Sequence, residues 1–386
     1  MHKLPRELTD CIIDLLHDDF ETLKQVSFVS KTSSERSRYH LFETLSITHF
    51  KLAELGQASL VVPCKYVRKL AFVWTGDPVK TSLMLSNFRE SKIHTLIVGS
   101  RQVSQLDRST IRQCFSAFPC AGITSLEFRS LFCQTPIFLT FTSLFPNLDN
   151  LAIAVHRWNE DELPEMNEEL MNRITFPSFR GRFQLSRPGA RWSWDSGYTS
   201  VLHFLARMPI RFHTTSLYVN RDNLGNVSSF LDACAPTIRR ILLDTAGCKP
   251  SLYLTSQCMI SHATYPVRTT PAGTLLAPCV KLEELHLGDG FINIPGAFIR
   301  CVLDSISSHT LRHLTIELSD RSRTKDLTWK ALDEALVRLS KRQEIAGRLV
   351  VEFSTLSSAE EVRDRLPGFQ DQGPLIVGHR GRPSYW

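Results

Sequence analysis

Apolar residues follow two different periods along this chain, and the change from one to the other lies near residue 45. Over residues 4–45 they recur every three or four positions, the spacing that places side chains on one face of an α-helix. In the opening run LPRELTDCIIDLL this spacing produces a single apolar stripe formed by Leu8, Ile12, Leu15 and Leu16. The sequence therefore predicts that the chain begins with a compact helical segment.

Capping residues divide this segment into three short helices. Pro5 stands in the first turn of the first helix, where its missing N–H costs nothing. Asp18 and Glu21 resemble a capping box for the second helix, and Ser30 can cap the third. We expect the three helices to share a small apolar core. Beside the first stripe, it would contain Leu23, Val26, Phe28, Tyr39, Leu41 and Phe42.

This segment resembles the F-box, the module that docks substrate receptors of cullin-based ubiquitin ligases on an Skp-family adaptor, in the form found in large fungal families. The opening LPRELTDCII matches the LPxEL start and the aliphatic pair of the motif, and SFVSKTSSERSRYHLFETL matches its closing portion. Where the family usually carries a tryptophan, this chain has Thr32, Ser33 and Ser34. The resemblance implies adaptor contacts from Leu4, Pro5, Leu8, Ile12, Ile13, Leu16, Leu23 and Val29.

From about residue 65 a short pattern repeats, with an apolar residue followed at positions +3 and +5 by two more. Two apolar residues spaced by two lie on the same side of a strand, so each copy predicts a strand with one buried face. The central residues are 24 to 30 positions apart in most of the array. They are Leu70, Leu96, Leu126, Leu151, Leu217, Ile241, Leu285 and Leu314, with Phe183 and Leu185 marking a further strand and LVVEF a closing one.

Segments with helical spacing separate these strands, such as VSSFLDACA and TWKALDEALVRLSKR. A strand and helix that repeat cannot bury their apolar sides alone, so neighbouring copies must stack. The expected fold is α/β, with a parallel sheet on one side of a curved array and helices on the other. It resembles an irregular leucine-rich-repeat solenoid without the asparagine ladder, although a doubly wound α/β domain has the same alternation.

These patterns divide the chain into an F-box-like domain over residues 1–45, a solenoid over 46–370 and a tail over 371–386 that is expected to be disordered. Two stretches interrupt the repeat, at about 156–198 and 247–278. Insertions in repeat arrays often carry binding residues. We therefore select Arg187, Arg191, Trp192 and Trp194 as candidate target-binding residues. The alternative is that the two tryptophans plug the core of the solenoid.

Composition and the lack of known catalytic motifs argue against several classes of protein, namely nucleic-acid-binding proteins, membrane proteins and enzymes. A net charge of +6, with no run of more than two basic residues, gives little support to nucleic-acid or membrane binding. No membrane-spanning segment or signal peptide is expected, so the predicted location is the cytoplasm, the nucleus or both. No nucleophile elbow, phosphate loop or HExxH motif occurs, and we assign no catalytic residue and no cofactor.

The ten cysteines are dispersed singly, which predicts reduced thiols rather than a disulfide framework. The nearest approach to a metal signature is Cys301 with His309 and His313. Because His313 falls at an outward position of the strand pattern TLRHLTIEL, we predict no metal site there.

The predicted function is that of a substrate-recognition subunit of an SCF-type ubiquitin ligase. The partners would be an Skp-family adaptor, a cullin scaffold held through it, and an unknown target protein bound by the repeat region. The alternative is a stand-alone interaction scaffold that does not bind the adaptor.

Overall fold

The computed structural model describes residues 4–47, 64–74, 77–100, 108–133, 135–158, 182–186, 201–202, 204–206, 212–218, 224–244, 274–288, 296–318, 329–343, 349–355 and 358–379. The chain divides into two compact units, Met1–Ser178 and Phe179–Trp386. No helix among the described residues is both long enough and apolar enough to cross a membrane.

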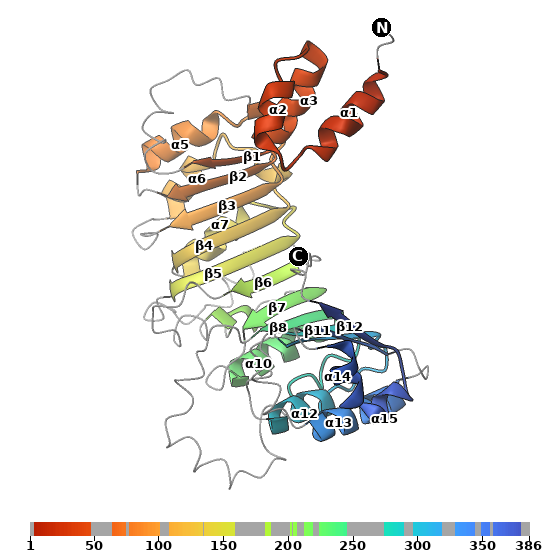
Figure 1. Ribbon diagram of the computed structural model, residues 1–386. Coiled ribbons are helices and arrows are strands. Elements are labelled where there is room, and N and C mark those ends of the chain that lie inside the picture. Colours follow the sequence, from red (N-terminus) through yellow and green to blue (C-terminus); the bar gives the residue numbers. More distant parts are fainter. Residues whose placement is uncertain are drawn as a thin grey trace, which may run out of the picture. The chain divides into compact units, whose positions relative to one another are not determined.

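Unit 1 begins with three helices and continues as parallel strands paired in the order of the sequence (Figure 1). The N-terminal helices are α1 Arg6–Leu15, α2 Phe20–Val26 and α3 Lys31–Phe42. The strands are β1 Thr44–Ile47, β2 Lys69–Trp74, β3 Thr95–Ser100, β4 Ser125–Cys133 and β5 Asn150–Trp158. Between them lie α5 Pro78–Ser86, α6 Arg108–Cys114, α7 Thr135–Ser143 and the short 3-10 helices Cys64–Tyr66 and Cys120–Gly122.

The repeated apolar positions form buried rows across the strands of unit 1. Leu70 pairs in register with Leu96, Leu96 with Leu126, and Leu126 with Leu151. All four side chains are buried. Each fully buried leucine contributes roughly 1.5–3 kcal/mol, so these rows account for the stacking of successive repeats.

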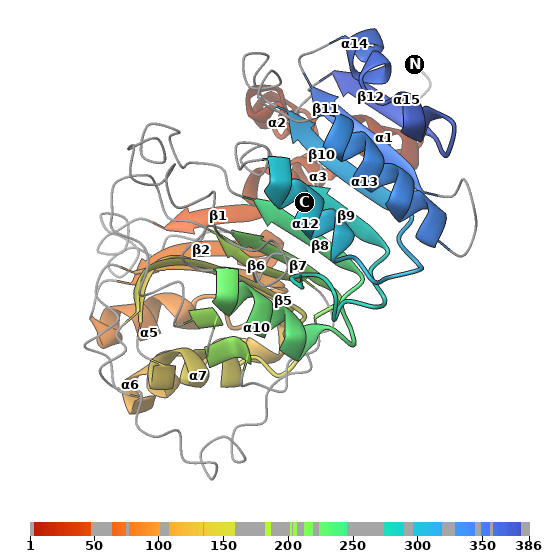
Figure 2. The same ribbon diagram turned by 90° about the horizontal axis from the view of Figure 1, so that it is seen from below.

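Unit 2 has the same plan. Its strands are β6 Arg182–Ser186, β7 Thr214–Tyr218, β8 Arg240–Asp244, β9 Glu284–Leu287, β10 His313–Leu318, β11 Val350–Thr355 and β12 Leu375–His379. Each pairs in parallel with the next. Its helices are α10 Leu224–Cys234, α12 Gly296–Asp304, α13 Trp329–Arg342, α14 Ala359–Asp364 and α15 Pro367–Gln370. Figure 2 shows α12 and α13 side by side over one face of this sheet.

The sequential strand order confirms a solenoid-like parallel α/β arrangement within each unit. A doubly wound domain contains a point at which the strand order reverses, and the described strands of neither unit have one. The doubly wound alternative is therefore wrong. The predicted strands all occur, because their paired apolar residues match the buried face of each strand.

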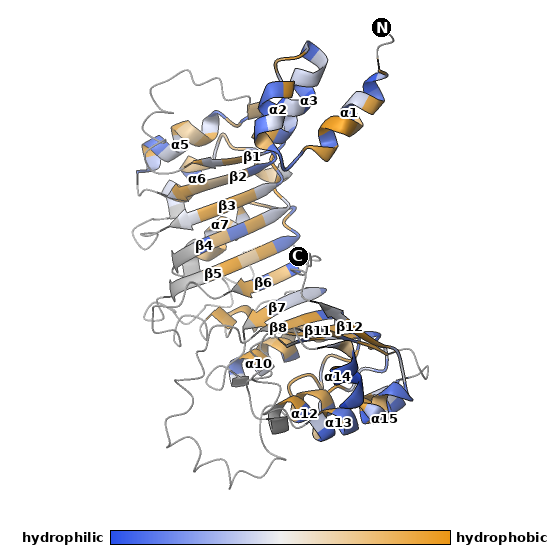
Figure 3. Cartoon of the chain, in the orientation of Figure 1, coloured by the Kyte–Doolittle hydropathy of each residue, from blue (hydrophilic) through white to orange (hydrophobic). Residues whose placement is uncertain are grey.

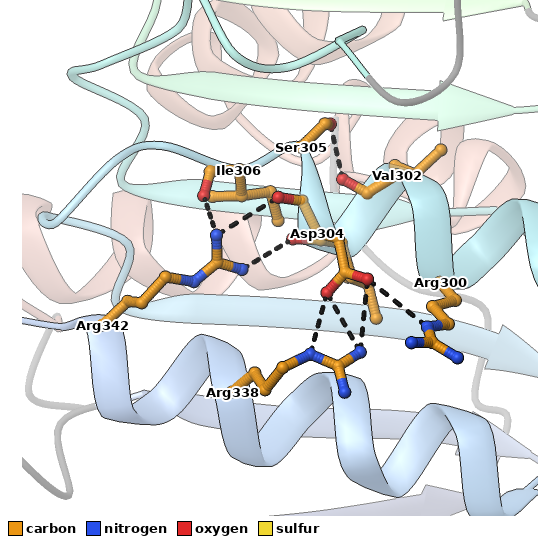
Figure 4. A network of polar contacts seen from close by, with 8 residues as sticks. Arg300, Val302, Asp304, Ser305, Ile306, Arg338 and Arg342 are labelled. Atoms are coloured by element: carbon orange, nitrogen blue, oxygen red, sulfur yellow. Dashed lines mark hydrogen bonds and ion pairs between the residues drawn. The ribbon is translucent and has the colours of Figure 1, made fainter. Parts of the chain in front are cut away.

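A polar network joins the neighbouring helices α12 and α13 (Figure 4). Arg338 on α13 donates hydrogen bonds of 3.1–3.2 Å to both carboxylate oxygens of Asp304, the last residue of α12. Arg342, one turn further along α13, donates to the carbonyl oxygens of Leu303, Asp304 and Ile306 at 3.0–3.2 Å. These contacts satisfy carbonyl groups that the end of α12 leaves without helical partners.

Two predicted domain boundaries require correction. The N-terminal domain does not extend to Leu45, since Thr44–Ile47 forms β1 and pairs with β2. The tail expected to be disordered from residue 371 contains β12, which pairs with β11 over Leu375–His379. The β1 strand carries the repeated spacing through Phe42, Leu45 and Ile47, but Phe42 and Leu45 had been assigned to the helical segment. The β12 strand has Leu375 and Val377 but no apolar residue three positions before Leu375. Residues 380–386 lie outside the described part.

The helix caps agree with the sequence except for one shift. Ser30 accepts a hydrogen bond from the Ser33 amide, as predicted for the third helix, and Ser358 caps α14 by accepting one from the Glu361 amide. The second helix is capped by Asp19 rather than Asp18. The adjacent aspartates offer the same chemistry, so the sequence did not distinguish them.

Candidate docking surface

The N-terminal helices are held together by a few buried side chains and one charged cluster. Ile13 of α1 and Leu23 of α2 are buried, with 2% and 0% of their surfaces exposed. The Arg36 guanidinium on α3 donates two hydrogen bonds of 2.6 Å to the Asp14 carboxylate on α1. His40 Nε2 lies 2.7 Å from the same carboxylate. One acidic group therefore joins α1 to two positions of α3.

The charged cluster also shifts the acidity of its carboxyl group. The hydrogen bonds from Arg36, and secondarily from His40, lower the pKa of Asp14 to about 2, against the opposing effect of burial. The same pair raises the pKa of the Arg36 guanidinium. Both groups are thus held in their charged forms at neutral pH. The Arg36 guanidinium also lies 5.2 Å from the centre of the Tyr39 ring, a cation–π distance.

The apolar stripe of α1 faces solvent instead of the helical core. Leu8, Ile12 and Leu15 are 51%, 50% and 82% exposed, so the expectation that they contribute to a shared core is wrong. Hydrophobic residues lie along α1, most of them in its C-terminal half (Figure 3). Phe28, also expected in that core, is 89% exposed. These side chains remain exposed because only Ile13 on α1 is directed into the bundle.

Exposed apolar residues are concentrated in this part of the chain. Among the described residues, eleven large apolar side chains are strongly exposed, and seven of them lie between Leu4 and Val29. The seven are Leu4, Leu8, Ile12, Leu15, Phe20, Phe28 and Val29. Single exposed apolar residues are ordinary on a protein surface, and a concentration of seven within 26 residues of sequence makes this part of the chain a candidate for binding a partner. We call these seven residues the N-terminal apolar surface.

The residues selected from the sequence fall into two classes. Leu4, Pro5, Leu8, Ile12 and Val29 are exposed and available to a partner. Leu16 is half-buried, whereas Ile13 and Leu23 are buried and can support the surface only from beneath. Three exposed residues were not selected, namely Leu15, Phe20 and Phe28. Leu15 could have been found, because it belongs to the same stripe as Leu8 and Ile12.

Thr32, Ser33 and Ser34 occupy the position where the F-box family carries a tryptophan. Thr32 is exposed, Ser34 is half-buried and Ser33 is 4% exposed. The Ser33 hydroxyl bonds to the Ser30 carbonyl, and its amide bonds to the Ser30 side chain. This part of the surface therefore forms a helix start built from small polar side chains and supplies no aromatic contact.

The second candidate region lies outside the described residues. This holds for Arg187, Arg191, Trp192 and Trp194 and for most of the insertions at 156–198 and 247–278. The residues weighed as a metal site are engaged elsewhere, since His309 Nδ1 contacts the Arg342 carbonyl and His313 Nε2 contacts Glu352. Within the described ranges, no three His, Cys, Asp or Glu side chains are grouped to hold a metal ion.

The sheet of unit 2 carries two charged pairs between neighbouring strands, and His313 is the one member that the sequence had singled out. His286 lies beside Glu317, and His313 lies beside Glu352, as outward-facing residues of neighbouring strands. Alternation along its strand placed His313 outward, but the pairing with Glu352 depends on register, which sequence alone did not provide.

Comparisons with known proteins add no identification. No protein-family model and no curated protein matches this chain.

Proposed function

We propose that this chain is the substrate-recognition subunit of a cullin-based, SCF-type ubiquitin ligase. In this proposal the N-terminal helices dock on an Skp-family adaptor, which connects the chain to a cullin scaffold. The parallel β/α array holds a target protein. The expected location is the cytoplasm, the nucleus or both.

The observation that carries the proposal is the concentration of exposed apolar side chains between Leu4 and Val29. These residues coincide with the segment whose sequence resembles an F-box, and five of the eight positions selected for adaptor contact are exposed there. A free apolar surface on a small helical module is what docking on a partner requires. The charged cluster of Asp14, Arg36 and His40 supports it by joining α1 to α3.

The chain would promote ubiquitin transfer without taking part in the chemistry. Holding a target near a conjugating enzyme raises the effective concentration of the target lysine. The proposal therefore assigns no catalytic residue, no metal and no cofactor to this chain. Target recognition would lie in the repeat region, including the candidate residues Arg187, Arg191, Trp192 and Trp194.

A stand-alone interaction scaffold is the second candidate. Thr32, Ser33 and Ser34 favour it, because they replace the aromatic residue usual in the F-box with a polar helix start. Both candidates retain a binding role for the array and differ only in adaptor docking.

Co-expression of the full chain with an Skp-family adaptor separates the two candidates. The proposal predicts a complex of one chain with one adaptor that survives size-exclusion chromatography and recruits the cullin scaffold when it is added. If the two proteins elute separately and titration detects no association, the chain is not an SCF-type subunit and the stand-alone interaction scaffold becomes the favoured function.

A further inference from the structure

The sheet of unit 2 ends at β12, one edge of which has no neighbouring strand in the described part of the chain. On its other edge β12 pairs in parallel with β11, and the Val351 amide donates to the Pro374 carbonyl at 3.1 Å. Because backbone groups alternate in direction along a strand, those of Ile376 also point to β11. The N–H and C=O groups of Leu375 and Val377 therefore point away from the sheet, and they have no hydrogen-bond partner among the described residues.

The buried rows of the sheet are incompletely covered at this edge. Val351 and Phe353 on β11 are 0% exposed, and they pair in register with Leu375 and Val377 on β12. Partners in register lie on the same face of a sheet, yet Leu375 and Val377 are only half-buried. On the other face, 49% of Ile376 is exposed. One additional strand would therefore cover apolar side chains on both faces.

The edge has none of the features that keep edge strands apart in monomeric proteins. Such strands usually carry charged residues, an outward-facing proline or a bulge. The β12 sequence LIVGH contains no Asp, Glu, Lys, Arg or Pro, and its pairing with β11 contains no register shift. Pro374 precedes the strand, and its carbonyl faces β11. The edge is therefore open to pairing with another strand.

A second copy of this chain supplies a strand that fits this edge. Two copies that pair through the same edge are related by a twofold axis, so their β12 strands run antiparallel. With Ile376 opposite its own counterpart, Leu375 of each copy lies opposite Val377 of the other. Each such pair can exchange both of its N–H···O bonds, and no charged residues meet. One pairing thus covers both open edges at once, whereas a strand from another protein would cover one.

We propose that this chain forms a twofold-symmetric dimer in which the two β12 strands pair antiparallel. Two short strands bury much less than the roughly 1,200–2,000 Å² of a stable interface, so the dimer is weak, with a dissociation constant on the order of 10–100 μM. It joins two repeat arrays in one complex, which raises the effective concentration of the second array for a target bound to the first. The dimer does not require the adaptor. Its use in capturing substrates for ubiquitin transfer rests on the proposed function.

Sedimentation equilibrium of the purified full chain without adaptor tests the dimer. Loading concentrations of about 1–300 μM span the expected dissociation constant. The average mass should rise with concentration from the 43.9 kDa of one chain towards twice that value. A mass that stays at that of one chain over the whole range would overturn the proposal.

Charges at position 376 test the register of the two strands. Ile376→Lys and Ile376→Glu should each weaken dimerisation by at least about tenfold, because like charges would stand directly opposite each other. An equimolar mixture of the two variants should restore dimerisation to within about threefold of wild type, since opposite charges then meet. Restoration requires both variants to be folded, so it separates a lost interface from a lost fold. Failure of the mixture to restore dimerisation would contradict the proposal.

A proline at position 377 tests the backbone pairing. Val377→Pro removes an N–H group that points away from β11 and leaves the β11–β12 hydrogen bonds in place, so dimerisation should weaken by at least about tenfold. Val280→Lys is the matched control for the lysine variant, because Val280 is a 54% exposed apolar residue of unit 2 outside β12. It should dimerise as wild type does. An equal loss in Val280→Lys and Ile376→Lys, or no loss in Val377→Pro, would overturn the pairing of β12.

The N-terminal apolar surface is the competing interface between two copies. The Leu8→Ala, Ile12→Ala double variant should dimerise as wild type does, and loss of dimerisation in this variant would overturn the proposal. The outcome is separable from that of the proposed function. A β12 dimer without adaptor association would leave a dimeric scaffold. Adaptor association by a chain that stays monomeric would remove the dimer and leave the receptor function standing.

Discussion

The Arg36 guanidinium on α3 donates two hydrogen bonds of 2.6 Å to the Asp14 carboxylate on α1. The two residues are 22 positions apart in the sequence, so the pair joins the first and third helices. On the same helix as Asp14, the apolar residues Leu8 and Ile12 are half exposed. The pair therefore anchors the helix that presents the proposed docking surface, although neither charged residue belongs to that surface.

Asp14→Asn should loosen α1 from α3. We expect a loss of about 1 kcal/mol in the stability of the helical segment, a discounted value because the Asp14 side chain is 39% exposed. Hydrogen exchange of the α1 amides measures this local opening. Asp18→Asn is the control, since Asp18 is exposed and lies outside the Asp14–Arg36–His40 cluster. Equal exchange in wild type and Asp14→Asn would contradict the anchoring role.

The same carboxylate predicts a dependence on pH. The pKa of Asp14 is about 2 in the folded chain and 3.8 for an ordinary aspartate, so the unfolded state binds the proton first as the pH falls. The contribution of the Asp14 carboxylate to the free energy of unfolding is therefore present above about pH 4 and is lost as the pH falls towards 2. Urea unfolding of the helical segment between pH 5 and pH 3 should therefore show a flatter pH dependence for Asp14→Asn than for wild type. Parallel curves would exclude Asp14 as the titrating group.

Thiol reactivity should follow burial. Desolvation raises the pKa of Cys114 to about 11 and the pKa values of Cys234 and Cys279 to about 12, which suppresses their thiolate forms at neutral pH. Cys11 is exposed. In a time course of alkylation followed by peptide mass spectrometry, Cys11 should react first and the three buried cysteines only after unfolding. Labelling of Cys234 and Cys279 as fast as Cys11 would contradict the packing of unit 2. Intact mass without alkylation also tests the prediction that the thiols are reduced.

The last strand should contribute to the stability of unit 2. A chain ending at Asp371 lacks β12. The edge of β11 is then uncovered, including Phe353, which pairs in register with a residue of β12 in the full chain. We expect a loss of roughly 2–4 kcal/mol in urea unfolding, because the pairing and the apolar cover of one edge disappear together. A chain ending at His379 keeps β12 and serves as the control. Equal urea midpoints of unfolding for the two truncated chains would show that β12 does not contribute to the stability of unit 2.

Arg342 should stabilise the contact of α12 with α13. Arg342→Ala leaves the carbonyl oxygens of Leu303, Asp304 and Ile306 without their charged donor. The expected cost is about 1–2 kcal/mol in unfolding of unit 2. Lys341→Ala is the control, since Lys341 is exposed in the same turn of α13. Similar losses in the two variants would mean that the helix end does not depend on the guanidinium.

The strands of the array could be predicted because the apolar spacing within each repeat shows which of its residues are buried. Leu70, Leu96 and Leu126 carry the same spacing and occupy the same buried row, so local pattern and tertiary packing agree. Strand β1 was not predicted because its spacing, Phe42 with Leu45 and Ile47, overlaps the end of the helical pattern, and β12 was not predicted because Gln372 stands where the spacing has an apolar residue. Their identity depends on a neighbour that completes the sheet.

The candidate sites were less predictable, for different reasons. Periodicity showed that Leu8 and Ile12 share a face, but it did not show whether that face is covered. The resemblance to an F-box implied that both residues contact an adaptor, and in the folded chain both are half exposed. The pairing of His313 with Glu352 depends on strand register between residues 39 positions apart. Such register is a property of the folded sheet and has no local signal.

Titration of an Skp-family adaptor into the full chain by calorimetry tests the central claim most directly. Leu8 and Ile12 are half exposed, so burial of their remaining surface contributes about 0.8–1.5 kcal/mol each. The Leu8→Ala, Ile12→Ala double variant should therefore bind about ten- to a hundredfold more weakly than wild type. Val79→Ala with Leu83→Ala is the matched control, an exposed apolar pair with the same spacing on α5, and it should bind as wild type does. Absence of binding by wild type, or equal affinities of the two double variants, would contradict adaptor docking through the N-terminal apolar surface.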